Sequence, residues 1–133
     1  MTVLRNISKT SLLKLIPVTF AAFIWVTPAS AGDAAAGKVI YDGKGACAIC
    51  HGATGAGDGV ASAAFNPKLA SFVIPAFRLD TDGDGNSGTD TDLSNAIING
   101  AAKYGGNAGM PGRADFSDTE VNDLIAYIRS LQK

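Results

Sequence analysis

The sequence predicts a small all-α protein with three to five short helices joined by long loops. Segment 118–131 repeats apolar residues at the three- and four-residue spacing of one helix face. No segment alternates apolar and polar residues as a half-buried strand does. Most of the 16 glycines fall between the helical segments, which favours irregular connections.

The first 31 residues have the layout of a secretory signal peptide. Three basic residues precede an apolar run at 15–26, and small residues surround the expected cleavage site after Ala31. A retained membrane anchor is the alternative, but the run is shorter than the roughly 20 residues that span a bilayer. We expect Sec-dependent export to the periplasm, which leaves 32–133 as one soluble domain without stable membrane insertion.

The net charge of segment 32–133 limits the classes of partner that are expected. Cleavage removes three of the 11 basic residues and none of the 12 acidic ones, which leaves a net charge of −4. Nucleic acid is not an expected partner, because it calls for a basic surface. So short a chain buries only about 60–70% of its unfolded surface, so a disulfide, a metal or a large apolar cofactor would matter to its stability.

The first helix is expected at 33–43 and leads directly into the most informative motif. Asp33 caps this helix, and the Asp42-Gly43 pair ends it. The next segment, 45–55, contains both cysteines and the single histidine of the chain, which are Cys47, Cys50 and His51.

Three chemistries use such a cluster. A disulfide suits an exported protein, whereas a thioredoxin-like site needs a βαβ setting that this Gly- and Ala-rich stretch lacks. Structural zinc needs four nitrogen or sulfur ligands, and the cluster offers three.

The third chemistry is covalent haem attachment, which is the known meaning of C-x-x-C-H. On a helical turn Cys47 and Cys50 face the same way, toward two haem vinyl groups, and His51 can reach the iron. We therefore predict one covalent haem c.

Met110 is the expected second axial ligand of the iron. The chain has no second histidine, and Met1 leaves with the signal peptide. Met110 sits in a Gly-rich stretch beside Pro111, which reads as a loop rather than as a core segment. Core filling, an open or water-bound iron, and a Lys or Tyr ligand are the alternatives. Methionine ligation raises the reduction potential and closes the coordination sphere, which favours electron transfer.

The stretch after the motif is expected to line the haem. A carbonyl beside Pro67 is available to accept the imidazole Nδ1–H of His51, although a simple turn proline is the alternative. Four apolar residues are expected in the pocket wall, namely Leu69, Phe72, Ile74 and Phe77. The candidate donors to the haem propionates are Arg78, Lys103, Tyr104 and Arg113.

An acidic stretch at 79–93 matches the start of a calcium-binding loop, D-x-D-x-D-G. Its twelfth position is Thr91 instead of Glu, and the flanking helices of an EF-hand are missing, so a true EF-hand is excluded. A solvated acidic loop and a docking surface for a basic partner are two interpretations. The third is an irregular calcium site made by Asp80, Asp82, Asp84, Asn86 and Asp90.

Two further helices are expected in the second half of the chain. A short helix at 91–100 begins with Thr91 or Asp92 as its cap and ends at Gly100. The last helix opens with a capping box formed by Ser117 and Glu120, and its apolar stripe faces the core.

Taken together, these motifs resemble those of class I c-type cytochromes, the small soluble bacterial ones. The matching segments are "GKVIY", "CAICH", "NPKL", "GMPGR" and "AYIRSL", and the resemblance covers nearly all of 32–133. It implies the cytochrome c fold around one haem, with Gly37 and Tyr41 packed against the last helix near Tyr127. By position it also implies Pro67 as the carbonyl partner of His51.

The expected function is one-electron transfer rather than enzymatic catalysis, since no catalytic acid–base pair or nucleophile stands out. The redox partners would be a dehydrogenase or quinol-oxidising complex as donor and a terminal oxidase or reductase as acceptor. One alternative is a haem protein with an open distal site for gas binding or peroxide chemistry. Another is a dedicated cytochrome subunit of a periplasmic oxidoreductase.

Overall fold

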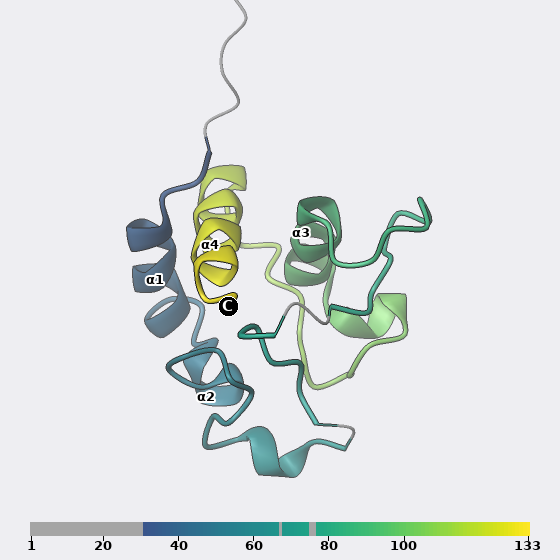
Figure 1. Cartoon of the computed structure of the whole chain (residues 1–133), viewed down its shortest axis with the longest axis horizontal. Coiled ribbons are helices and arrows are strands. Elements are labelled where there is room, and N and C mark those ends of the chain that lie inside the picture. The colour runs from purple at the N-terminus through teal and green to yellow at the C-terminus, as the bar shows by residue number, and fades with distance from the viewer. Residues whose placement is uncertain (1–30, 67, 75–76) are drawn as a thin grey trace, which may run out of the picture.

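A computed structural model describes residues 31–66, 68–74 and 77–133 and shows only helices and loops within them. In chain order the elements are α1 (Ala34–Asp42), α2 (Ala48–His51), the 3-10 helix η1 (Ser62–Ala64), α3 (Asp90–Asn99), the 3-10 helix η2 (Ala101–Tyr104) and α4 (Asp118–Ser130). The all-α prediction is therefore confirmed (Figure 1). In this part of the chain no helix has the length and apolar character needed to cross a bilayer. The predicted signal peptide lies outside it, apart from Ala31.

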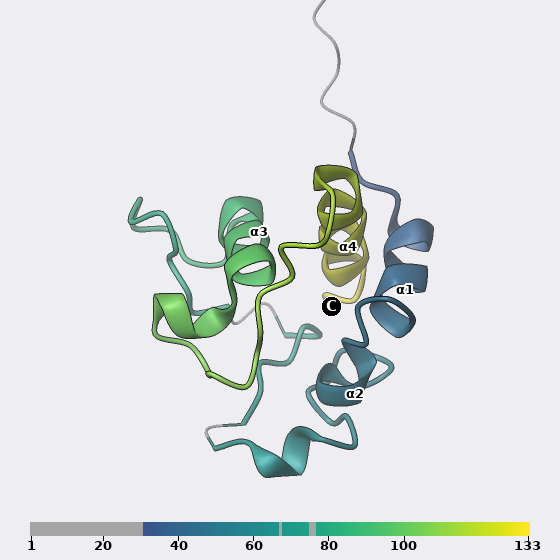
Figure 2. The ribbon, with the colours of Figure 1, turned by 180° about the vertical axis from the view of Figure 1, so that it is seen from behind.

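The pair formed by α1 and α4 is the closest helix packing in the described structure. The two helices lie side by side in both views (Figures 1 and 2). Gly37 makes this approach possible, because a Cβ atom there would overlap the carbonyl oxygen of Asp123 and lie 2.9 Å from the Cβ of Tyr127. The Tyr41 side chain, fully buried, packs edge-on against Tyr127 with ring centroids 5.1 Å apart. The crossing implied by the family resemblance is confirmed.

The ends of α1 and α4 follow the expected caps. The Asp33 carboxylate accepts hydrogen bonds from the first amides of α1, and the Asp33 amide donates to the carboxylate of Asp123 on α4. Ser117 and Glu120 form the predicted capping box at the start of α4. The stripe of α4 is buried as expected, with Val121, Leu124, Ile125 and Ile128 each at most 5% exposed.

The start of α3 differs from the prediction. The helix is capped by Thr89, not by Thr91 or Asp92, and Asp92 occupies the third helical position. There its carboxylate returns a hydrogen bond to the Thr89 amide, which completes a capping box with Asp in place of the usual Glu or Gln. The helix therefore begins at Asp90, two residues earlier than a cap at Thr91 would allow.

Asp92 also fastens the acidic loop to the core. The carboxylate is 1% exposed and accepts hydrogen bonds from the amide and hydroxyl of Thr81 and from those of Thr89. These bonds, that of the Thr81 amide foremost, hold the pKa of Asp92 well below its ordinary value of 3.8. A buried anion with four donors closes the base of loop 81–89.

We predict that Asp92→Asn destabilises the protein at neutral pH by roughly 1–3 kcal/mol, because the amide leaves some of these buried donors unpaired. The stabilisation from the ionised carboxylate is complete above the unfolded-state pKa of 3.8 and is lost as the pH falls below it. Urea unfolding should thus show the gap between wild type and variant narrowing by about 1 kcal/mol between pH 6 and pH 3.

Asp82→Asn serves as the control, since it removes a charge from the same exposed loop and none of the bonds to Asp92. This variant should unfold close to wild type at pH 6. A gap between Asp92→Asn and wild type that stays constant with pH would contradict the account.

Candidate functional site

A cavity of about 500 Å³ lies among α2, α3, η2, α4 and the loops around them. Its size falls in the range of roughly 300–1,000 Å³ that small-molecule and cofactor sites occupy. His51 and Met110 both line it. Much of the remaining wall is apolar and comes from Leu69, Ala70, Phe72, Phe77, Leu79, Leu93, Ala96, Ile97, Ala101 and Ile128.

The two cysteines stand on the helical turn that the spacing predicts. The Cys47 carbonyl accepts from the amides of Cys50 and His51 at 3.2 and 2.8 Å, which makes Cys47 the first residue of the α2 turn. Both thiols are free and half-buried, so they are not joined in a disulfide. Burial raises the pKa of the Cys47 thiol to about 11, which keeps it protonated at neutral pH.

His51 is held in a defined orientation on one side of the cavity. Its ring stacks on Phe72, with centroids 4.4 Å apart and an angle of 20° between the planes. Burial lowers the pKa of His51, which favours the neutral imidazole that a metal requires. Its Nδ1 lies 3.4 Å from the carbonyl oxygen of Ala70. A proton on Nδ1 can be donated there, which leaves the Nε2 lone pair for a metal.

The carbonyl that faces His51 therefore belongs to Ala70, three residues beyond Pro67. Pro67 itself lies outside the described residues, and its predicted role stays a prediction. The expected wall also needs one correction. Leu69, Phe72 and Phe77 line the cavity, but Ile74 does not, since it sits on the surface and is 63% exposed.

Met110 lies in a loop that is fixed to the C-terminal end of α3. The Met110 carbonyl accepts from the Ala101 amide at 3.2 Å, and the Arg113 amide donates to Ile97 at 2.8 Å. Gly100 has a positive φ of 84°, and a Cβ atom there would lie 2.9 Å from the amide nitrogen of Gly112. Glycine thus lets the loop lie directly on the end of the helix, with the half-buried Met110 at the cavity.

A few polar side chains complete the cavity lining. They show which of the candidate propionate donors lie at the cavity and which do not. Arg78 and Tyr104 line the cavity, as do Lys68 and Asn107, which sequence reasoning did not single out. Lys103 instead approaches Asn99, and Arg113 is engaged by Asp115.

The acidic loop brings together only part of the predicted calcium site. Carboxylate oxygens of Asp80, Asp82 and Asp84 lie within 4.8 Å of one another, all on exposed residues. The Asn86 side-chain amide donates to Asp84. Asp90 turns away and pairs with Arg129 at 2.8 Å. Calcium binding stays a prediction for this loop.

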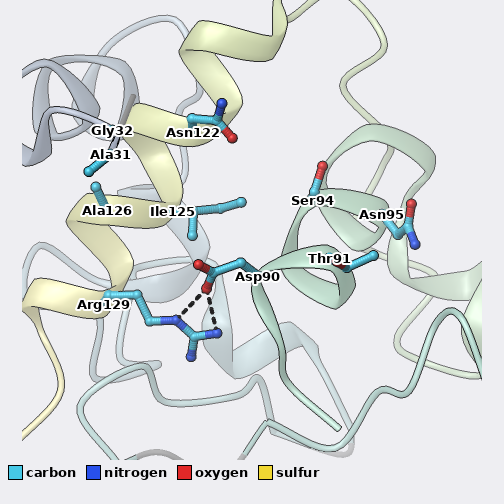
Figure 3. A pocket seen from close by; sticks show the side chains of 10 residues that line it. All are labelled: Ala31, Gly32, Asp90, Thr91, Ser94, Asn95, Asn122, Ile125, Ala126 and Arg129. Atoms are coloured by element: carbon cyan, nitrogen blue, oxygen red, sulfur yellow. Dashed lines mark hydrogen bonds and ion pairs between the residues drawn. The ribbon is translucent and has the colours of Figure 1, made fainter. Parts of the chain in front are cut away.

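The Asp90–Arg129 pair borders a second cavity of about 520 Å³ between α3 and α4 (Figure 3). Ser94, Asn95 and Asn122 contribute polar groups to its lining, beside the apolar Ile125 and Ala126. It contains no cysteine, histidine or methionine, so the chemistry of the sequence motif belongs to the first cavity.

Comparison with known proteins supports this assignment. The family model described as cytochrome c matches residues 34–132. The chain belongs to the cytochrome c family. It is 35% identical over 102 residues to cytochrome c-554(547) of Halothiobacillus neapolitanus, a match that covers 77% of this chain and all of that protein.

A solved structure gives a second comparison. It is a chain from a reducing HAO-like protein complex of Kuenenia stuttgartiensis, with a TM-score of 0.56 and 27% sequence identity. The match covers 73% of this cytochrome and 41% of that longer chain. The likeness therefore concerns one part of the larger protein.

Family membership implies covalently bound haem c and a role in electron transport. The described residues fit this group, since the free thiols of Cys47 and Cys50 stand on the same turn as His51, which lines the apolar cavity. The cytochrome would attach the porphyrin edge through those thiols.

We predict that either single variant, Cys47→Ala or Cys50→Ala, keeps its haem through denaturing solvent extraction, because one thioether is enough to hold it. The double variant should release all of it. The measurement is haem absorbance that remains with the precipitated protein. Retention of haem by the double variant would contradict attachment at these residues.

Proposed function

We propose that this cytochrome is a one-electron carrier whose haem iron is ligated by His51 and Met110. The observation that supports this most is the lining of one apolar cavity by both side chains, from segments 59 residues apart in sequence. The bound haem supplies the one-electron redox chemistry. Protein side chains set how its iron is held and how far water reaches it.

Each ligand has a distinct part in this proposal. The His51 imidazole is oriented by Phe72 and by the Ala70 carbonyl, so its free nitrogen points in a fixed direction. The Met110 thioether would hold the iron from the other segment, and such a ligand favours the reduced state and so raises the reduction potential. The apolar wall disfavours the additional charge of the oxidised site, which acts in the same direction.

The redox partners remain those expected from sequence, a dehydrogenase or quinol-oxidising complex as donor and an oxidase or reductase as acceptor. The likeness to a chain of the Kuenenia stuttgartiensis complex favours a second form of the same function. In that form the cytochrome serves as a dedicated subunit of one oxidoreductase, and it would co-purify with that enzyme.

We predict that Met110→Ala lowers the reduction potential and abolishes the weak long-wavelength ferric band that iron–sulfur charge transfer produces. Leu69→Ala is the matched control, because it truncates another half-buried residue of the cavity wall. The control should keep the band. Potentiometric titration followed by absorbance measures both properties.

An unchanged potential in Met110→Ala would overturn the ligand assignment. Rapid carbon monoxide binding by the ferrous wild type would instead favour the open distal site. The two results are separable, since one is read from the variant and the other from the wild type.

We also propose periplasmic export with cleavage after Ala31. Support comes from the sequence of segment 1–31 and from the start of the fold, because Asp33 already caps α1 and bonds to α4. Gly32, directly after the proposed site, already lies against α4, since a Cβ atom there would overlap the carbonyl oxygen of Asn122.

The protein recovered from a periplasmic extract should therefore begin at Gly32. Mass spectrometry of the intact protein, with one haem added to the polypeptide mass, measures this directly. Recovery of the uncleaved chain in the membrane fraction would show a retained anchor.

A further inference from the structure

We propose that Arg113 is a positioning residue that holds the Met110 loop closed over the cavity. The inference rests on the proposed ligation by Met110 and adds the part of the chain that keeps this ligand in place. The Met110 loop is taken here as residues 107–116, between η2 and α4.

The Arg113 guanidinium joins this loop to the segment that leads into the cysteine motif. It donates to the carbonyl oxygens of Lys44 and Gly45 at 2.9 and 3.0 Å. The second of them, Gly45, lies two positions before Cys47. Arg113 therefore joins the loop of the distal ligand to the start of the attachment motif. The two bonds span 68 residues of sequence to Gly45 and 69 to Lys44.

The guanidinium is oriented by partners on its own loop. Its Nε donates to one carboxylate oxygen of Asp115 at 2.9 Å and a terminal nitrogen donates to the other at 3.1 Å. The planar group also lies over the Phe116 ring at 4.2 Å from the centroid. A two-point ion pair and a stacked ring fix the direction of the remaining donors, which is why a planar fork suits this position better than a lysine.

Lys44 strengthens the same junction from the other side. Its ammonium approaches the Asp115 carbonyl at 3.4 Å and pairs with Glu120 at 2.8 Å. Glu120 belongs to the capping box of α4. The junction thus ties the end of the Met110 loop to both the attachment segment and the start of α4.

The short connection between Arg113 and Met110 carries this constraint to the ligand. Only Pro111 and Gly112 lie between them, and proline restricts its own φ. A Cβ atom on Gly112 would lie 2.6 Å from the Ile98 carbonyl oxygen, so this residue lies flat against the end of α3. Because this connection is short and restrained, the position of Arg113 determines the position of Met110. Loss of the Arg113 bonds would therefore let Met110 move away from the iron.

Arg129 offers a matched comparison within the same chain. It too pairs with an aspartate, donates to a backbone carbonyl at Gly88 and lies over a phenylalanine ring. The two arginines have similar exposure, 26% for Arg113 and 31% for Arg129. Arg129, however, holds the loop of residues 77–88, which contributes Phe77 to the cavity wall, and its hydrogen bonds to described residues go to Asp90 and Gly88 rather than to the Met110 loop.

The test is displacement of the methionine ligand by imidazole in the ferric haem-loaded protein. Loss of the long-wavelength ferric band reports displacement, and thermal unfolding of the same samples reports stability. Arg113→Gln should lower the imidazole concentration at half displacement about tenfold, which corresponds to about 1.4 kcal/mol. Arg129→Gln should lose comparable thermal stability and leave the imidazole concentration within about twofold of wild type.

Equal imidazole affinity of the two variants would overturn the proposal, since both would then reflect general loosening. If Arg113→Gln yields no haem-loaded protein, Asp115→Asn replaces it, because this change removes the carboxylate that orients the guanidinium. Tighter imidazole binding by Asp115→Asn supports the proposal, and wild-type binding overturns it. A wild type without the band would refute Met110 ligation itself, and the role of Arg113 with it.

Discussion

The cavity between His51 and Met110 is the constraint on which the rest of the structure depends. Its wall draws residues from α2, α3, η2, α4 and the loops at 68–79 and 105–110, so most of the fold meets at this one space. A chain this short has few buried side chains to spare, and among the described elements the α1–α4 pair has the most extensive packing. The haem that the family implies would therefore serve as part of the core as well as the redox centre.

Both sides of the cavity are anchored at the C-terminal end of α1. The Tyr41 hydroxyl donates to the Gly52 carbonyl at 2.7 Å, directly after His51, and fixes the side of the histidine. The Lys44 and Gly45 carbonyls accept hydrogen bonds from Arg113, which we propose fixes the side of the methionine. Because Gly37 brings α1 against α4, these anchors rest on the most closely packed helix pair of the described structure. Electron transfer needs ligands that stay in place in both oxidation states, and the proposed ligands His51 and Met110 would both depend on this one support.

Sequence reasoning succeeded where the information is local. The cysteine–histidine turn, the caps of α1 and α4 and the stripe of α4 each lie within a few neighbouring residues, and the structure reproduces them. It failed where the path of a loop decides, as for the outward position of Ile74. For the same reason the sequence did not single out the Ala70 carbonyl beside His51. The Thr89 cap was missed because Asp92 completes its capping box in place of Glu or Gln. Nothing in the sequence marks the bonds from Arg113 to residues 68 and 69 positions away.

The absorption spectrum of the wild-type protein, ferric and then ferrous, before and after denaturing extraction of free haem, tests the central claim most directly. Attachment at Cys47 and Cys50 and ligation by Met110 predict a c-type ferrous spectrum that survives extraction and a weak long-wavelength ferric band in the native protein. A high-spin ferric spectrum without that band would contradict ligation by Met110. A protein without haem absorbance, with Cys47 and Cys50 joined in a disulfide, would contradict the whole account.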